Sequence, residues 1–271
     1  MASISIITIN YNNDKGLERT IKSVVDQTST DFEYLIVDGG STDTSVQIIK
    51  SHVDRIAWWV SEKDKGIYNA MNKGIERSTG EYLLFLNSGD FFNDEKVIAD
   101  LHRAIAKYEH YKIIYGNIEF RDPTGHGQVY KFPEKLTLDY FLEHSIPHPS
   151  TLIHKSLFHE FGGYDESLKI VADWSFFFKV IILHSAEYKQ IDRNVAVFIT
   201  DGISSQSENN SLIAEERQQV IRSLLPPAML EFIDKKNSFE RYYHKYRIEK
   251  IDRLVKKTKN VLGIVSKKHT Q

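Results

Sequence analysis

The chain has 271 residues, of which 41% are hydrophobic, and it carries a formal net charge of −2. This is enough for one large domain or for a domain with an appendage. The absence of cysteine excludes disulfides and thiolate metal sites. No apolar run approaches the roughly 18 residues of a membrane-spanning helix. The N-terminus, MASISIITIN, lacks the basic and long apolar regions of a signal peptide and is expected to form a strand.

Short apolar runs alternate with helical periodicities along residues 3–120. The runs are rich in β-branched residues, as buried strands are. Between them, apolar residues recur at helical spacing, as at positions i, i+3, i+4, i+7 and i+8 from Ile67 to Ile75. The expected strands are 3–10, 33–38, 55–61, 81–87 and 112–120. This alternation predicts an α/β fold with a mostly parallel central sheet flanked by helices.

The second half of the chain is less regular. Residues 121–150 are expected to form a loop with one short helix, and 150–155 a further strand. A mostly apolar helix is expected at 171–183, beginning near Asp173. From about residue 210 onward the pattern is helical and polar.

Charge is distributed unevenly along the chain. Residues 235–271 contain twelve Lys or Arg against three acidic residues, while the other 234 residues contain 23 basic against 34 acidic side chains. Apolar residues recur at helical spacing through 242–265, so this segment is predicted to be an amphipathic helix with a basic face. Such a helix binds an anionic membrane surface, packs in a homodimer, or is merely solvated. A nucleic-acid partner is not expected, because the rest of the chain is acidic and lacks a reader motif.

Polar side chains follow the predicted strands where each strand ends. They are Asn10, Asp38, Glu62 to Asp64, and Asn87 to Asp90. In parallel α/β sheets ligands bind outside the carboxyl ends of the strands, so these clusters are expected to meet in one crevice. No G-x-G-x-x-G follows the first strand and no Walker lysine motif is present. These absences count against a dinucleotide oxidoreductase and a P-loop phosphotransferase.

Several side chains have a functional and a structural interpretation. Asp38 accepts hydrogen bonds from a base or a ribose, or it holds the turn that follows. Asp90 ligates a divalent cation, which takes hard oxygen ligands, or it serves as a helix cap or turn residue. Asp173 precedes an apolar helix, where a carboxylate is a cap or part of a site. His148 lies between two prolines and is expected in a site wall or a loop; the prolines argue against a zinc pair with His144.

Four stretches carry a resemblance to a known family. They are SIITINYN, YLIVDGGSTDTS, SEKDKGIYNAMNKGIERSTGEYLLFLNSGD and GGYDESLKIVADW. They resemble the family 2 inverting glycosyltransferases with the glycosyltransferase A fold, above all the branch that builds bacterial capsule, exopolysaccharide or lipopolysaccharide. The similarity implies a catalytic domain at 1–209, with a Rossmann-like nucleotide-binding half at 1–120 and an acceptor half at 121–209. Residues 210–271 then form a helical, basic C-terminal extension.

The resemblance also implies roles for individual positions. Asp38 corresponds to the carboxylate that binds the uracil or other base, and Asp90 to the remaining member of the metal motif. Asp173 corresponds to the general base that deprotonates the acceptor hydroxyl. His148 and Trp174 fall on the acceptor side. The other positions implied to bind the nucleotide sugar are Thr8, Asn10, Asp64, Lys65, Gly66, Asn72, Asn87, Ser88 and Gly89.

The metal motif departs from the family pattern. Asn87 and Gly89 stand where relatives commonly carry carboxylates, so Asp90 alone remains. One carboxylate, with waters and the oxygens of a diphosphate, still holds Mg²⁺ or Mn²⁺. Alternatively, Lys65 or a helix N-terminus neutralises the leaving diphosphate without metal. The small residues of NSGD are expected to let the diphosphate approach the backbone.

These observations predict a glycosyltransferase of the hexosyltransferase type, cytoplasmic or peripheral on the inner face of the cytoplasmic membrane. It transfers a sugar, with inversion, from a nucleoside-diphosphate sugar, with UDP favoured, to a hydroxyl of a glycan or lipid-linked acceptor. The incomplete metal motif leaves open a degenerate nucleotide-sugar-binding scaffold without activity. A nucleotidyltransferase is disfavoured, because no glycine-rich basic loop for a triphosphate follows the first strand.

Overall fold

The computed structural model describes residues 4–122, 124–200, 207–239, 242 and 250. The chain divides into two compact units, an N-terminal unit, Met1–Arg217, and a C-terminal unit, Gln218–Gln271. The amphipathic segment predicted at 242–265 lies outside the described residues, apart from Tyr242 and Lys250. None of the described helices is long and apolar enough to cross a membrane.

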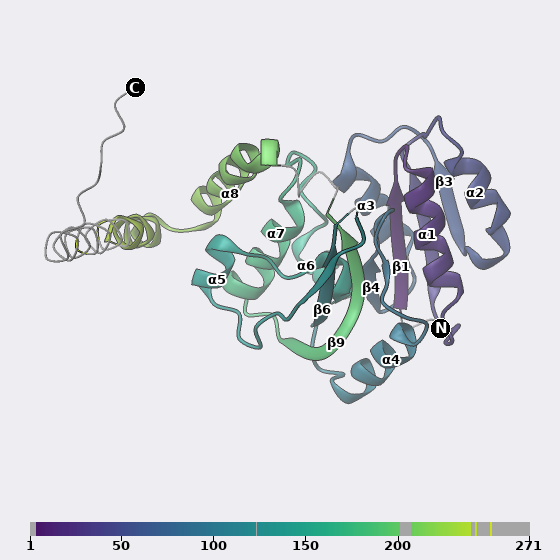
Figure 1. The fold of residues 1–271 in the computed structure, drawn as a ribbon. Coiled ribbons are helices and arrows are strands. Elements are labelled where there is room, and N and C mark those ends of the chain that lie inside the picture. Colours follow the sequence, from purple (N-terminus) through teal and green to yellow (C-terminus); the bar gives the residue numbers. More distant parts are fainter. Residues whose placement is uncertain (1–3, 123, 201–206, 240–241, 243–249, 251–271) are drawn as a thin grey trace, which may run out of the picture. The chain divides into compact units, whose positions relative to one another are not determined.

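The first half of the N-terminal unit forms the parallel part of one sheet (Figure 1). Its strands are β1 (Ile4–Asn10), β2 (Glu33–Asp38), β3 (Trp58–Ser61) and β4 (Tyr82–Phe85). They pair in the order β3-β2-β1-β4, and all run in one direction. β1 and β4 are buried throughout, as expected for apolar strands whose side chains point to both covered faces of a sheet.

Further strands extend the sheet beyond β4. They are β5 (Phe91–Phe92), β6 (Ile113–Arg121), β7 (Gly127–Tyr130), β8 (Thr151–His154) and β9 (Tyr188–Ile199). The spatial order continues β4-β8-β6-β9-β5, and β7 pairs with β6. Because β8 is antiparallel to both β4 and β6, and β9 is parallel to β6, the strands β6 and β9 share the direction of β1. The predicted α/β fold with a mostly parallel sheet is confirmed.

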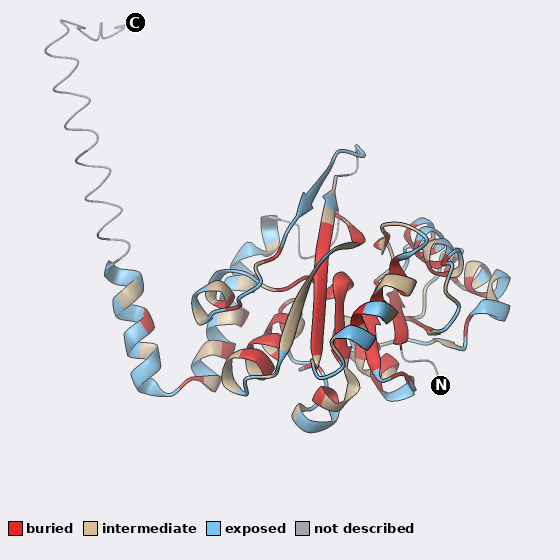
Figure 2. Ribbon diagram, turned by 90° about the horizontal axis from the view of Figure 1, so that it is seen from below, coloured by how far each residue is buried: buried red, intermediate tan, exposed pale blue. Residues whose placement is uncertain are grey.

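Helices flank this sheet, and the buried residues gather in the central strands (Figures 1 and 2). α1, α3 and α4 bury one apolar face each and leave the opposite face polar. The buried helix predicted at 171–183 consists of α7 and a π-helix at Phe178–Leu183. The helices are α1 (Asp14–Val25), α2 (Ser45–Ser51), α3 (Ile67–Arg77), α4 (Val97–Lys107), α5 (Leu138–Glu143), α6 (Lys155–Phe161), α7 (Ala172–Phe177) and α8 (Asn210–Leu224), with shorter 3₁₀ turns at Val53–Arg55, His148–Ser150 and Ser207–Asn209.

Three strands lie where the sequence predicts none: the two-residue strand β5, and the longer strands β7 and β9. Residues 121–150, expected to be a loop with one short helix, contain β7 as well as α5. All four residues of β7 are exposed, so no alternation of apolar and polar side chains marks it. The first half of β9 likewise lacks a buried run. β7 and β9 both depend on pairing with β6, which is a long-range interaction that a local pattern does not record.

The close approach of α3 to β1 depends on a glycine. A Cβ atom at Gly74 would lie 2.5 Å from Cγ2 of Ile7, and both residues are buried. Native interiors have no room for such a contact, because they are packed as densely as organic crystals. Gly74 therefore sets the distance between α3 and the sheet.

We expect Gly74→Val to destabilise the protein by about 2 kcal/mol, because the added methyl groups overpack the α3–β1 interface. Thermal unfolding followed by circular dichroism measures this as a lower midpoint. Glu76→Val, which places the same side chain at an exposed position of the same helix, is the matched control. Equal midpoints for the two variants would contradict the packing role of Gly74.

Candidate active site

The end of β1 and the segments that follow β2, β3 and β4 border a cavity of about 730 Å³. It collects residues from distant parts of the N-terminal unit. Of the residues singled out in the sequence, those in its wall are Asn10, Asp64, Gly66, Asn87, Ser88, Gly89, Asp90, His148 and Asp173. Those outside its wall are Thr8, Asp38, Lys65, Asn72 and Trp174.

The carboxylate of Asp38 is buried where β2 ends, and it joins three strand ends. Its Oδ1 accepts hydrogen bonds from Asn10 Nδ2 at 2.7 Å and Ser41 Oγ at 2.6 Å. Its Oδ2 accepts from Ser61 Oγ at 2.6 Å and from the Ser41 N–H at 2.9 Å. Burial opposes the charge, but these hydrogen bonds outweigh it and hold the pKa of Asp38 below its ordinary value. Asp38 therefore fixes the turn after β2, whose two glycines line the cavity.

The turn Asn87–Asp90 follows β4 and is held by α1. The Asp90 N–H donates to the Asn87 carbonyl oxygen at 3.0 Å, and Gly89 has a φ of +111°. The hydroxyl of Thr20 on α1 donates to the Asp90 carbonyl oxygen at 2.6 Å and accepts from the Gly89 N–H at 3.0 Å. Asp90 leads into β5 and not into a helix, so the helix-cap interpretation of Asp90 is wrong.

The segment that leads into α3 carries Asp64 and Gly66 to the cavity. Asp64 Oδ1 accepts the Gly66 N–H at 2.9 Å, and Gly66 has a φ of +125°. A Cβ atom at Gly39 would collide with the Asp64 carboxylate, so glycine lets this segment close against the turn after β2. The structure places Lys63 in the cavity wall and Lys65 outside it.

Asp173 lies in the first turn of α7 and lines the cavity. The single O–H of Tyr68, on α3, is shared between the Ile170 carbonyl oxygen at 2.5 Å and Asp173 Oδ1 at 3.1 Å. Burial, and then the charge of Asp173, raises the pKa of Tyr68 well above its ordinary value, so Tyr68 stays a donor. The helix begins after Val171, so Asp173 is not its cap residue.

His148, the first residue of the turn His148–Ser150, also lines the cavity. Its ring stacks on Phe85 with centroids 4.6 Å apart, and its Nε2 lies 2.7 Å from the Tyr164 hydroxyl. Burial lowers the pKa of His148, and the charge of Asp173 only partly opposes this. The imidazole is therefore neutral at neutral pH.

Three of the implied positions support the site without lining it. Thr8 Oγ1 donates to the carbonyl oxygen just after β4, at 2.7 Å. Asn72 Nδ2 donates to the Tyr164 carbonyl oxygen at 2.9 Å. Trp174 Nε1 donates to the Phe141 carbonyl oxygen at 2.8 Å, within the core. The first two bonds tie together segments that border the cavity, and the third ties α7, which carries Asp173, to α5.

The structure adds cavity residues to which the sequence argument assigned no role of their own. Tyr11 is 66% exposed in the wall, and Lys63 and Lys169 also line it. Tyr68 also lines it, behind Asp173. Some of these residues could have been found from their positions in the sequence. Tyr11 and Lys63 stand near strand ends, and Tyr68 stands close to residues 64–66. Lys169 lies in a loop whose sequence offers none.

Oxygen donors suited to a divalent cation meet at the Asn87–Asp90 turn. Asp90 lines the cavity at this turn, and the side-chain oxygen of Asn87 is buried without a hydrogen-bond partner. Among the described residues, no group of three or more His, Cys, Asp or Glu could hold a metal by itself. These residues fit a cation that arrives with the oxygens of its ligand, as Mg²⁺ does when it keeps waters and one protein carboxylate.

Sequence comparison identifies the family. Residues 5–162 match the model of the family Glycosyl transferase family 2. The chain is 32% identical over 219 residues to an uncharacterized glycosyltransferase of Mycobacterium tuberculosis, covering 80% of this chain and 82% of that protein. The chain therefore belongs to glycosyl transferase family 2, and the enzyme is a glycosyltransferase. The family expected from the motifs is confirmed.

Solved structures share the fold. S. aureus TarS 1-349 in complex with UDP-GlcNAc matches with a TM-score of 0.63 at 20% identity, covering 81% of this chain and 64% of that chain. The mannosyltransferase PcManGT from Pyrobaculum calidifontis, in complex with GDP-Man and Mn²⁺, matches with a TM-score of 0.57 at 13% identity, covering 97% of this chain and 88% of that chain. The chain thus spans less than two thirds of TarS 1-349. These likenesses confirm the glycosyltransferase A fold.

We expect acid to destabilise the protein partly through His148. The lowered pKa means that the folded protein binds this proton less readily than the unfolded chain does. This contribution is complete above the ordinary histidine pKa of about 6.5 and is lost as the pH falls from there through the lowered pKa of the folded state. Thermal midpoints measured from pH 8 to pH 5 should fall less steeply in His148→Gln than in wild type. His144→Gln removes an exposed imidazole and should keep the wild-type slope; an unchanged slope in His148→Gln would contradict this origin.

Proposed function

We propose that this glycosyltransferase transfers a sugar, with inversion, from a nucleoside-diphosphate sugar to a hydroxyl of a glycan or lipid-linked acceptor. The observation that carries the proposal is one cavity lined by both the Asn87–Asp90 turn and Asp173. Its volume of about 730 Å³ lies within the roughly 300–1,000 Å³ typical of ligand sites. UDP-GlcNAc in TarS and GDP-Man in PcManGT support a donor of this class. The resemblance of the motifs supports a role in bacterial surface polysaccharide synthesis, at the cytoplasmic side of the membrane.

The nucleotide end of the donor fits the carboxyl ends of β1 and β2. Tyr11 is 66% exposed there and offers a ring on which a base stacks. The side-chain oxygen of Asn10 is buried without a partner, so a ligand N–H or O–H would satisfy it. Asp38 is 0% exposed, so a direct contact of its carboxylate with the base requires the turn after β2 to open. Lys63 and Lys169 supply positive charge for the phosphates.

The diphosphate end fits the Asn87–Asp90 turn. Mg²⁺ or Mn²⁺ would be held there by the Asp90 carboxylate and the Asn87 side-chain oxygen, together with diphosphate oxygens and water. When bound, the cation neutralises the negative charge that develops on the departing diphosphate. The Mn²⁺ of PcManGT supports this assignment.

Asp173 is the proposed general base. It takes the proton of the acceptor hydroxyl while the acceptor oxygen forms its bond to the anomeric carbon. The bond from that carbon to the diphosphate oxygen breaks, and the nucleoside diphosphate leaves with the electron pair. Attack from the face opposite the leaving group inverts the anomeric configuration. Tyr68 orients the carboxylate through its hydrogen bond to Oδ1.

Titration calorimetry with UDP and GDP, each with and without Mn²⁺, tests the donor site. We expect one nucleotide to bind, more tightly with Mn²⁺ than without. In Asp90→Asn the gain from Mn²⁺ should shrink about tenfold or more, because a neutral amide holds a cation less well than a carboxylate does. Asp54→Asn, which changes an exposed carboxylate in the Val53–Arg55 turn, is the matched control.

Each other outcome has a defined meaning. Nucleotide affinity that is equal with and without Mn²⁺ would contradict the metal role of Asp90 but not the proposed donor site. Absence of binding to either nucleotide would contradict the proposed donor class. Binding without release of sugar from UDP-GlcNAc or GDP-Man, in the presence of Mn²⁺, would favour the degenerate scaffold.

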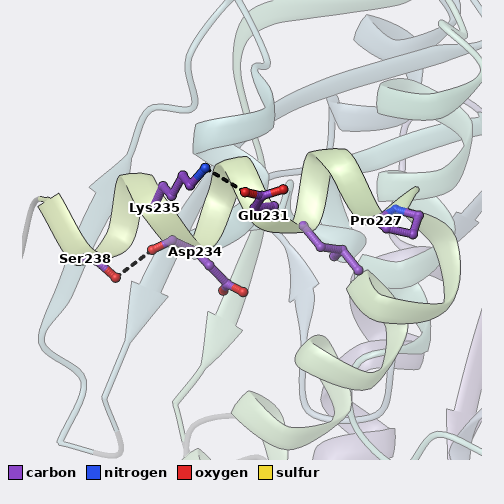
Figure 3. A pocket seen from close by; sticks show the side chains of 6 residues that line it. Pro227, Glu231, Asp234, Lys235 and Ser238 are labelled. Atoms are coloured by element: carbon purple, nitrogen blue, oxygen red, sulfur yellow. Dashed lines mark hydrogen bonds and ion pairs between the residues drawn. The ribbon is translucent and has the colours of Figure 1, made fainter.

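We propose also that the C-terminal unit binds an anionic membrane surface. Its helical residues 227–239 expose Met229, Phe232 and Phe239 at 38%, 66% and 69%, and helical spacing puts these side chains on one side. Twelve Lys or Arg between 235 and 271 provide the complementary charge. Another side of the same helix carries an open hollow with the ion pair Lys235–Glu231 at 2.6 Å and the side chains of Asp234 and Ser238 (Figure 3). The aromatic side is thus the one suited to lipid.

Sedimentation with phosphatidylcholine vesicles, with and without phosphatidylserine, tests this surface. Wild type should bind the anionic vesicles preferentially and less at high salt. The double variant Phe232→Asp, Phe239→Asp should bind them about tenfold more weakly, because it loses apolar burial and gains negative charge. Val53→Asp, at an exposed apolar position of the N-terminal unit, is the control. Self-association that the double variant abolishes, without vesicle binding, would assign this surface to a homodimer instead.

A further inference from the structure

We infer that Glu216 is a positioning residue that holds the segment 169–173, and with it Lys169 and Asp173, in the cavity wall. The inference rests on the proposed function, which makes Asp173 the base. Glu216 lies on α8, outside the residues 5–162 that match the family model, and none of the sequence motifs includes it.

The carboxylate of Glu216 accepts three consecutive backbone N–H groups. Oε1 accepts from Lys169 at 2.7 Å, and Oε2 accepts from Ile170 at 3.0 Å and from Val171 at 3.3 Å. These amides lie just before α7, where no helical carbonyl is available to them. Glu216 itself is only 7% exposed, so both the carboxylate and the amides depend on these bonds.

Tyr68 holds the same segment from the other side. Its single O–H is shared between the carbonyl oxygen of Ile170 at 2.5 Å and Asp173 Oδ1 at 3.1 Å. Residue 170 is therefore bonded through its N–H to α8 and through its carbonyl to α3. With both ends of one residue fixed, the start of α7 has little freedom to shift relative to β1.

The neighbour of Glu216 reinforces the contact between α8 and α7. The guanidinium of Arg217 lies over the Trp174 ring, 5.0 Å from its centroid, and donates to the Glu143 carbonyl oxygen at 2.8 Å. Trp174 directly follows Asp173 on α7. Glu216 and Arg217 thus contact the chain on both sides of the proposed base.

The held segment supplies three residues to the cavity: Lys169, Ile170 and Asp173. A general base must meet the acceptor hydroxyl at hydrogen-bond distance, and a displacement of about 1 Å costs on the order of a hundredfold in rate. A structural element that fixes this segment therefore acts on the rate of transfer. α8, through Glu216, is that element.

Hydrogen exchange measured by mass spectrometry tests the hold without any substrate. Glu216→Ala should speed exchange of the amides of residues 169–171 about tenfold or more, while the β1 amides exchange as in wild type. Glu216→Gln keeps one accepting oxygen, so its exchange rates at residues 169–171 should lie between those of wild type and Glu216→Ala. Glu215→Gln, at the exposed neighbouring position of α8, is the matched control. Thermal unfolding midpoints show whether each variant folds. If Glu216→Ala does not fold, the exchange measurement is made on Glu216→Gln.

Hydrolysis of UDP-GlcNAc or GDP-Man, with Mn²⁺ and with water as the acceptor, tests the consequence for the base. In Glu216→Ala, kcat should fall about 10- to 100-fold while KM for the donor rises much less. Asp173→Asn is the reference: it should lose hydrolysis and keep the wild-type exchange at 169–171. A merely structural Glu216 would lower the fraction of folded enzyme and leave kcat per nucleotide-binding site unchanged.

Unchanged exchange at 169–171 in Glu216→Ala would overturn the inference, whatever the donor. Faster exchange with kcat within about twofold of wild type would overturn it as well, because the segment would then move without consequence for the base. Wild-type protein that neither binds nor hydrolyses either donor would instead defeat the proposed function. In that case the exchange rates at residues 169–171 would by themselves decide whether Glu216 fixes this segment.

Discussion

The buried carboxylate of Asp38 is the constraint on which the rest of the site depends. A charge without water is tolerated only when hydrogen bonds replace the lost hydration. Asp38 draws these bonds from Asn10 on β1, from Ser61 on β3 and from Ser41 in its own turn. The three parallel strands must therefore end at the same level. The turns that leave them start from one fixed edge, and this edge forms the wall against which the donor is proposed to lie.

α3 connects this edge with the acceptor side of the cavity. Its N-terminus carries Gly66 beside the turn after β2, and its first turn carries Tyr68, which bonds to Asp173 on α7. Gly74, in its last turns, lets the helix lie against β1. One rigid helix thus relates the position of the proposed base to that of the strand ends. The contact of Glu216 with residues 169–171 adds a second support from α8.

The sequence predicts the parts of the molecule that local patterns encode. β1 to β4 are apolar runs with turn residues behind them, so both the strands and the polar clusters at their ends could be identified. β5, β7 and β9 escape prediction because pairing with distant strands defines them. At the site, Asn10, Asp90 and Asp173 were found because they stand at element ends. The course of a loop decides which of Lys63 and Lys65 lines the cavity, and the sequence does not record it. The role of Glu216 depends on contacts between residues 45 or more positions apart.

The backbone at Gly89 disfavours a second carboxylate in the Asn87–Asp90 turn. The nearest atom to a Cβ built there is Asn13 Nδ2 at 3.5 Å, so space alone would admit a side chain. The φ of +111° is what excludes it, because L-residues rarely adopt that conformation. Thr20 maintains the conformation by bonding the Gly89 N–H and the Asp90 carbonyl oxygen. An aspartate at position 89 would have to reshape a turn that α1 holds in place. The chain therefore retains a turn with one carboxylate and small neighbours, and the cation proposed at that turn would take its remaining ligands from the Asn87 side-chain oxygen, the diphosphate and water.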